Sequence, residues 1–229
     1  MTVVGVCSLH GSPGATSTAL ALAARLQVDH GGALLVEADP AGGVLAARLD
    51  LGLSPSVVDA AAAARRSLRP EDLERFLQSV DGGLDVLVAH PSSAQTSAAL
   101  RAGGPTLASL VAARTDHVVV DLGRWCPDAA SHVLVPVCVR LLIVIRPVLD
   151  QIVPLLHLVD PALPAERIGV VVIGRHRYTA KQIGEVSGLT VVGELPDDPA
   201  AVHADPCATR TRARANWAAR IRDLAGWCS

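Results

Sequence analysis

Residues 10–17, HGSPGATS, have the composition and spacing of a loop that binds an anion. An apolar run at residues 3–6 precedes this segment, and an Ala/Leu-rich stretch with helical character follows it. Where a strand, a glycine-rich loop and a helix follow in this order, backbone N–H groups point into one concavity and the helix dipole adds positive potential there. The sequence therefore predicts a phosphate-binding loop, although a plain strand-to-helix turn has the same order of segments.

The loop lacks the lysine that such a site normally carries. The usual pattern, G-x-x-x-x-G-K-[ST], places lysine directly before the Thr or Ser whose hydroxyl binds Mg²⁺. In this chain Ala15 stands before Thr16. Phosphoryl transfer is catalysed mainly by positioning and by neutralising charge on the phosphate oxygens, whereas backbone N–H groups bind an anion without a lysine. We therefore expect the loop to bind phosphate better than it catalyses phosphoryl transfer.

Carboxylates follow two other apolar runs. Glu37 and Asp39 come directly after the run at residues 33–36, and Asp121 follows the run at 117–120. Because Glu37 and Asp39 are two residues apart, their side chains project from the same side of an extended backbone. Ligands of open α/β sheets bind at the carboxyl ends of the strands. These carboxylates are therefore candidates for the same site, and turn or N-cap roles are the alternative.

Seven apolar runs rich in β-branched residues are separated by segments long enough for helices. They occupy residues 3–7, 33–36, 86–88, 117–120, 139–145, 168–173 and 189–192. Runs that are apolar on both faces are typical of a mostly parallel sheet covered on both sides. The sequence therefore predicts an α/β fold with a doubly wound, mostly parallel sheet and helices on both faces. No repeat or linker divides the chain, so we expect a single domain over residues 1–229.

Helices are predicted between and after these runs. The first is expected over about residues 16–28, an alanine-rich helix and then a helix start at Pro70 lie within residues 55–80, and a last helix covers residues 209–227. The most apolar region, residues 133–149, contains two arginines and two prolines. We interpret it as strands of a buried sheet and not as a membrane span.

The last predicted helix carries five arginines beside apolar side chains. Trp217, Ile221 and Leu224 follow an i, i+4, i+7 spacing, which predicts packing against the sheet. Peripheral membrane contact through residues 209–227 is the alternative that such an amphipathic pattern permits. Its arginines are not interleaved with aromatic residues in the way that nucleic-acid surfaces often are. We expect core packing with a solvated basic face, and the sequence gives no strong signal of a nucleic-acid partner.

The overall composition favours a protein of the cytoplasm. The chain has 20 basic and 22 acidic residues, so its net charge of −2 indicates neither a nucleic-acid nor an acidic partner. Its five cysteines include no C-x-x-C pair, which favours free thiols in a reducing compartment over a disulfide framework or a zinc site. The first residues lack the basic and long apolar regions of a signal peptide.

Five segments together resemble the ParA/MinD family of P-loop ATPases, whose deviant Walker A motif is K-G-G-x-G-K-[ST]. HGSPGAT at 10–16 falls on that motif, and VEADPAGG at 36–43 resembles the family's D-x-D-P-Q-G segment. VVVDLG at 118–123 is similar to its Walker B strand, and VIRP at 144–147 to its V-x-x-P segment. Residues 172–202 resemble the N-R segment, helix and G-x-[IL]-P-x-[DE] base loop. The resemblance spans nearly the whole chain and implies a P-loop NTPase fold.

The resemblance implies a role for each matching position. Asp39 would orient the attacking water, whereas Thr16 and Asp121 would hold Mg²⁺. The implied cofactors are therefore ATP or ADP with Mg²⁺. The positions implied to bind the nucleotide are Gly11, Ser12, Pro13, Gly14, Ala15, Thr16 and Ser17 around the phosphates, with Pro196 and Asp197 beside the base.

Four positions depart from the family pattern. His10 stands in place of the signature lysine, and Ala15 in place of the Walker lysine. Glu37 replaces the first Asp of D-x-D, and Gly174 replaces the Asn that reads the base. An unperturbed imidazole, with a pKa of about 6.5, is mostly neutral at pH 7, so a histidine replaces a lysine poorly. A nearby arginine would restore charge; the candidates are Arg124, Arg146 and Arg175.

The function implied by this resemblance is that of a nucleotide-binding module or pseudo-ATPase with a positioning, scaffold or regulatory role. Family ATPases form dimers in which the signature lysine reaches across the interface, so the implied partners are a second copy and an unidentified protein. The alternative is a slow but genuine Mg²⁺-dependent ATPase that drives partition or positioning of DNA, septum, secretion or pilus components. An enzyme acting on another phosphate ligand stays open, because fold does not dictate chemistry.

Overall fold

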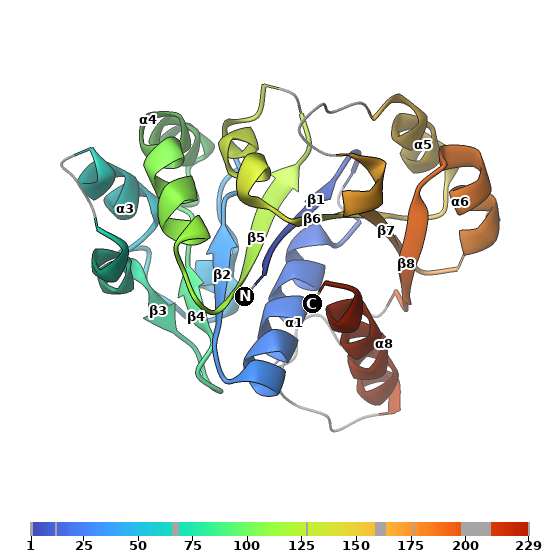
Figure 1. Ribbon diagram of the computed structural model, residues 1–229, viewed down its shortest axis with the longest axis horizontal. Coiled ribbons are helices and arrows are strands. Elements are labelled where there is room, and N and C mark those ends of the chain that lie inside the picture. Colours follow the sequence, from blue (N-terminus) through green and yellow to red (C-terminus); the bar gives the residue numbers. More distant parts are fainter. Residues whose placement is uncertain are drawn as a thin grey trace.

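The computed structural model describes residues 2–11, 13–65, 69–126, 128–158, 164–175, 177–197 and 212–228. The strands form one eight-stranded sheet in the order β3-β4-β2-β5-β1-β6-β7-β8 (Figure 1). Only β3 is antiparallel to its neighbour, so the predicted doubly wound, mostly parallel sheet is confirmed. The strands are β1 (Val3–Ser8), β2 (Ala33–Glu37), β3 (Gln78–Ser79), β4 (Asp85–Leu87), β5 (His117–Arg124), β6 (Arg140–Ile145), β7 (Ile168–Ile173) and β8 (Thr190–Leu195).

Helices connect these strands. The α-helices are α1 (Ala15–His30), α2 (Leu45–Arg48), α3 (Val57–Ala64), α4 (Ser93–Ala112), α5 (Leu149–Ile152), α6 (Ala180–Ser187) and α8 (Arg212–Cys228). The 3₁₀ helices are η1 (Pro70–Phe76), η2 (Ala130–Val137), η3 (Val153–His157) and η4 (Ala165–Arg167). The first predicted helix corresponds to α1, the alanine-rich one to α3 and the last to α8, although residues 209–211 lie outside the described residues. None of the described helices combines the length and the apolar character needed to cross a bilayer.

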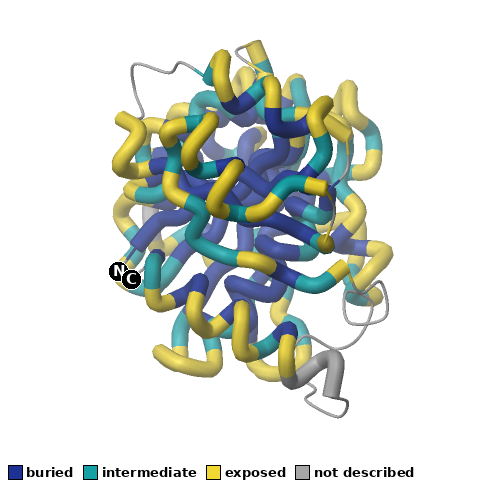
Figure 2. Tube along the Cα trace, turned by 90° about the vertical axis from the view of Figure 1, so that its right-hand side faces the viewer, coloured by how far each residue is buried: buried dark blue, intermediate teal, exposed yellow. Residues whose placement is uncertain are grey.

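The two faces of the sheet contribute to two separate hydrophobic cores. In β1, Val4 and Val6 belong to the core built with α1 and α8, whereas Val3 and Cys7 belong to the core built with α3 and α4. Successive side chains of a strand point to opposite faces, so a sheet covered on both sides needs apolar residues at every position. Figure 2 shows the resulting buried interior surrounded by exposed segments.

The apolar side of α8 packs inside the molecule. Trp217 is 8% exposed, Ile221 2% and Leu224 0%. The helix lies against α1 and β8, beside α1 in Figure 1. The predicted core packing of this helix is therefore confirmed, and its apolar residues are already covered by the chain itself.

The apolar region at residues 133–149 was expected to form strands, and this prediction is wrong for its first part. Residues Ala130–Val137 form the 3₁₀ helix η2, and β6 begins only at Arg140. Pro136 lies inside this segment and has no N–H group to donate to a strand ladder. Instead, η2 packs against α4, with Leu134 fully buried.

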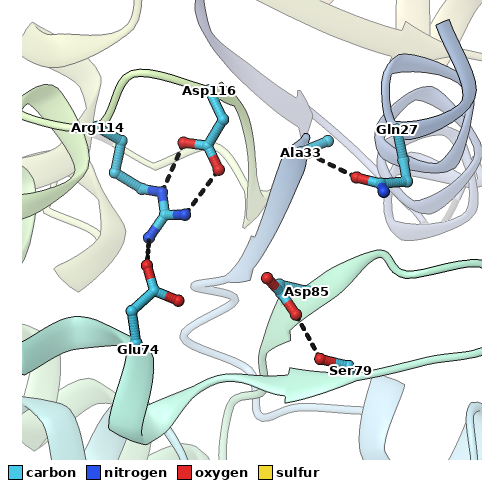
Figure 3. A network of polar contacts seen from close by, with 7 residues as sticks. All are labelled: Gln27, Ala33, Glu74, Ser79, Asp85, Arg114 and Asp116. Atoms are coloured by element: carbon cyan, nitrogen blue, oxygen red, sulfur yellow. Dashed lines mark hydrogen bonds and ion pairs between the residues drawn. The ribbon is translucent and has the colours of Figure 1, made fainter. Parts of the chain in front are cut away.

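The edge strand β3 was not predicted, because its two residues carry no apolar pattern. It pairs with β4, and the Ser79 hydroxyl donates a hydrogen bond to Asp85. Close by in Figure 3, Arg114 lies between the carboxylates of Glu74 in η1 and Asp116, at 2.7 and 2.6 Å. These polar contacts fix the position of η1 next to the sheet.

Replacing Gly103 by alanine should destabilise the fold. A Cβ on this α4 residue would lie 2.7 Å from Cα of Ala61 in α3, and backbone cannot move aside as a flexible side chain can. We expect the free energy of unfolding in urea to fall by about 1–3 kcal/mol. Gly226→Ala in α8 is the matched control, because an added Cβ there meets nothing within 4 Å. The control should leave stability unchanged or raise it by up to about 1 kcal/mol; equal effects of the two substitutions would contradict the close α3–α4 packing.

Candidate functional site

The loop between β1 and α1 has a backbone shape that only glycine adopts easily. Gly11 and Gly14 have φ angles of 66° and 108°, in the left-handed region. Gly14 is the N-cap of α1 and makes no side-chain cap hydrogen bond. The first N–H groups of a helix have no partner inside the helix. Without a capping side chain they are available to an anion, as the sequence predicted for this loop.

A cavity of about 400 Å³ opens beside this loop at the carboxyl ends of the strands. It brings together most of the residues that the sequence predicted for the phosphate site, together with the candidate Arg124 and a further arginine, Arg48. Ser12 lies outside the described residues, and the exposed His10 does not line the cavity. The lining residues are Ser8, Gly11, Pro13, Gly14, Ala15, Thr16, Ser17, Asp39, Ala41, Val44, Arg48, Gly123 and Arg124.

Asp39 lies in this cavity directly above the end of β5. Its Oδ1 accepts a hydrogen bond of 2.8 Å from the N–H of Ala41. A Cβ on Gly123, whose φ is +67°, would lie 2.2 Å from the Asp39 carboxylate carbon, so only glycine fits below it. Burial raises the pKa of Asp39, while the bond from Ala41 and the charge of Arg124 act in the opposite direction.

Asp121 is fully buried within β5, three residues before the strand ends, and lies near Thr16 and Asp39. Its Oδ1 accepts a 3.1 Å hydrogen bond from the N–H of Gly123, whereas Oδ2 has no hydrogen-bond partner among the described residues. Burial raises the pKa of Asp121 to about 7; the Thr16 side chain and Gly123 lower it, and the charges of Asp39 and Glu37 raise it. A buried carboxylate oxygen without a donor costs free energy unless a cation or a proton satisfies it. This arrangement fits a Mg²⁺ ion close to Thr16.

Glu37 has a different environment from the other two carboxylates. Its Oε1 accepts hydrogen bonds from the N–H groups of Val44 and Leu45, at 2.7 and 3.0 Å, and its Oε2 accepts one of 2.9 Å from Ala89. Glu37 is 1% exposed and does not line the cavity. It therefore positions the start of α2 and the chain just after β4, and does not itself line the cavity.

Of the three arginines named from the sequence, only Arg124 reaches the loop. Its Nη2 donates a 3.3 Å hydrogen bond to the carbonyl oxygen of Gly11. Arg146 forms an ion pair with Asp197, and Arg175 lines a second cavity. The sequence analysis missed Arg48, whose Nη1 donates a 3.1 Å hydrogen bond to Ser17 Oγ. Its position 31 residues away along the chain gives no signal of this contact.

Pro196 and Asp197 lie in the second cavity, of about 350 Å³, at the carboxyl ends of β7 and β8. Gly14 of the loop cavity lies close to the end of β7, since a Cβ on it would be 3.1 Å from Ile173, the residue before Gly174 of the second cavity. The Asp197 carboxylate accepts two hydrogen bonds from Arg146, of 2.7 and 3.3 Å. The lining residues are Gly174, Arg175, Glu194, Leu195, Pro196, Asp197, Asn216 and Arg220.

Asp121→Asn should remove part of the pH dependence of stability in the protein without Mg²⁺. Its pKa rises from 3.8 to about 7 on folding, so its stabilising contribution is complete below the unfolded value and is lost as the pH rises through about 7. We expect the free energy of unfolding of the wild type to fall between about pH 4 and 7, and to fall less in the variant. Glu37 and Asp39 also have raised pKa values, so some slope remains. Equal slopes in urea titrations of both proteins would contradict this assignment.

Comparison with known proteins identifies the fold. No family model and no curated protein sequence matches the chain. Among solved structures it is similar to a ParA family ATPase from Chlorobium tepidum TLS, with a TM-score of 0.81, 20% identity and coverage of 98% of this chain and 97% of that one. It is also similar to MinD complexed with Mg-ADP from Pyrococcus horikoshii OT3, with a TM-score of 0.77, 14% identity and coverage of 98% of this chain and 94% of that one. A third similar structure is the MinC:MinD cell division protein complex from Aquifex aeolicus, with a TM-score of 0.67, 16% identity and coverage of 99% of this chain and 94% of that one. The chain therefore has the ParA/MinD-like fold of the P-loop ATPases.

Proposed function

We propose that this chain is a ParA/MinD-like nucleotide-binding module whose catalytic site is degenerate. The observation that carries the proposal is the loop cavity itself. It keeps the two left-handed glycines and the uncapped start of α1, while the position expected for the Walker lysine holds the buried Ala15. The parts that bind phosphate through the backbone are thus retained, and the lysine that promotes hydrolysis is missing.

The residues around the loop fit a Mg²⁺-nucleotide. Backbone N–H groups at the start of α1 would hold the phosphates, and Thr16 with Asp121 would hold Mg²⁺, since the Oδ2 of Asp121 has no other partner among the described residues. Bound Mg²⁺ supplies positive charge to the phosphate oxygens. Pro196 and Asp197 would border the base in the neighbouring cavity. In support, the similar MinD from Pyrococcus horikoshii is complexed with Mg-ADP.

Weak hydrolysis follows from the missing charge. Removal of one group that stabilises transition-state charge costs on the order of 3 kcal/mol, or about a hundredfold in rate. Both lysine positions are changed, to His10 and Ala15. A slow but genuine Mg²⁺-dependent ATPase is the second candidate, because Asp39 lies in the same cavity, where it can orient a water molecule.

The proposed cellular role is that of a positioning, scaffold or regulatory module in the cytoplasm. It would act through a homodimer and a protein partner. The supporting observations are similarity to a ParA family ATPase and to a MinD found in complex with MinC. The described cysteines are free thiols, which fits a reducing compartment. Without lysine at position 10, other contacts would hold the dimer.

We expect the purified protein to bind ADP and ATP more tightly with Mg²⁺ than without it, measured by isothermal titration calorimetry. We also expect its ATP hydrolysis to be no faster than that of an Asp39→Ala variant, because both motif lysines are missing, at positions 10 and 15. Asp39→Ala keeps the loop intact and so is the matched control for hydrolysis. A Mg²⁺-dependent rate that the variant loses would establish the second candidate, and absence of any binding would overturn the proposal.

Ala15→Lys should tighten nucleotide binding. Ala15 lines the loop cavity, so a lysine there would place its ammonium group against the phosphates and add charge-assisted hydrogen bonds, of about 1.5–3 kcal/mol each. This corresponds to a decrease of about tenfold to a hundredfold in the dissociation constant of ADP. Ala15→Met, similar in length but uncharged, is the control. If both variants bind like the wild type, the loop is not a phosphate site.

A further inference from the structure

We propose that Arg48 and Arg124 supply, from two other parts of the chain, the positive charge that the loop lacks, and so bind the phosphate groups of a nucleoside di- or triphosphate. This inference rests on the proposed nucleotide-binding function and names the residues that make it work without lysines. Both side chains line the loop cavity. They reach it from opposite ends of the loop, Arg124 at Gly11 and Arg48 at Ser17.

Arg124 is positioned by the end of β5. Its guanidinium donates to the Gly11 carbonyl oxygen, and its charge affects Asp39 in the same cavity. The side chain therefore lies at the start of the loop, next to position 10. The hydrogen bond to Gly11 is 3.3 Å long and the residue is exposed. Such a weak contact can be exchanged for a phosphate oxygen at little cost, because a charged acceptor binds a guanidinium more strongly than a carbonyl does.

Arg48 is positioned by α2, whose start is fixed by Glu37. The buried carboxylate of Glu37 accepts the N–H groups of Val44 and Leu45. This anchor holds the short helix over the cavity, so that Arg48 at its last position reaches Ser17 Oγ at 3.1 Å. Arg48 thus lies at the other end of the loop, close to Thr16. A guanidinium there can contact a phosphate held at the start of α1.

The charge around the loop distinguishes these arginines from others in the fold. Arg114 is held by the carboxylates of Glu74 and Asp116, and Arg146 by Asp197. Among the described residues, neither Arg48 nor Arg124 forms an ion pair within 4.0 Å. The unpaired Oδ2 of Asp121, near Thr16, needs a cation or a proton, which fits the Mg²⁺ that accompanies a bound nucleotide. The two arginines therefore remain available to an anion.

The test measures binding of two probes by isothermal titration calorimetry at low salt. Pyrophosphate reports on the loop cavity alone, and Mg-ADP reports on the whole site. We expect Arg48→Ala and Arg124→Ala each to weaken both probes by about tenfold, and the double variant by about a hundredfold. Arg48→Lys and Arg124→Lys should stay within a few-fold of the wild type. Arg75→Ala, an exposed arginine of η1 that lines neither cavity, is the control and should bind like the wild type.

One further variant distinguishes failure of this inference from failure of the proposed function. Ala15→Asp places a negative charge in the cavity and should abolish binding. If Ala15→Asp abolishes binding while the arginine variants bind like the wild type, the proposed function stands and this inference is overturned. If the wild type binds neither probe, both are overturned.

Restoring binding in the double variant tests whether the arginines bind the ligand or only support the fold. Ala15→Lys in the Arg48→Ala/Arg124→Ala background should restore binding, because it returns charge to the same cavity from another position. The thermal melting temperatures of the unliganded variants should match that of the wild type. A lowered melting temperature with no rescue would show that the arginines only support the fold, and would overturn the inference.

Discussion

The buried carboxylate of Glu37 is the interaction on which the wall of the loop cavity depends. It satisfies three backbone N–H groups, two at the start of α2 and one after β4. An unpaired buried carboxylate or N–H would cost about 1–3 kcal/mol or more, so each partner fixes the other. The segment between Glu37 and α2 is thereby closed into a turn that carries Asp39 to the cavity and holds Arg48 over it.

A phosphate-binding loop normally combines backbone shape and positive charge in one short motif. Under the proposed function, the two are separated in this chain. The glycines at positions 11 and 14 and the uncapped start of α1 preserve the backbone shape, while cationic side chains reach the cavity from α2 and from the end of β5. Guanidinium groups pair well with phosphate oxygens. Here they approach the cavity from α2 and β5, whereas the usual lysine belongs to the loop itself. Binding and hydrolysis therefore need not be retained together.

The sequence predicted most of the sheet because its strands are buried on both faces and so form continuous apolar runs. It failed where another constraint decides the structure. Pro136 helps to turn an apolar segment into η2, and β3 is a two-residue edge strand held by pairing with β4. The long helix α4 contains Gly103, Gly104 and Pro105, residues that weaken a helical pattern. Its packing against α3 and η2 supplies what its intrinsic propensity lacks.

By itself, the sequence determined the α/β class, the glycine-rich loop and the carboxylates at strand ends, because these depend on local spacing and on the alternation of strands and helices. It also marked the absence of lysine at positions 10 and 15. Only the tertiary structure decided which arginines lie beside the loop and that Glu37 supports the site without lining it. The contacts of Arg48 with Ser17 and of Arg124 with Gly11 join residues 31 and 113 positions apart. Such pairs are set by the register and crossovers of a parallel sheet, which no local pattern contains.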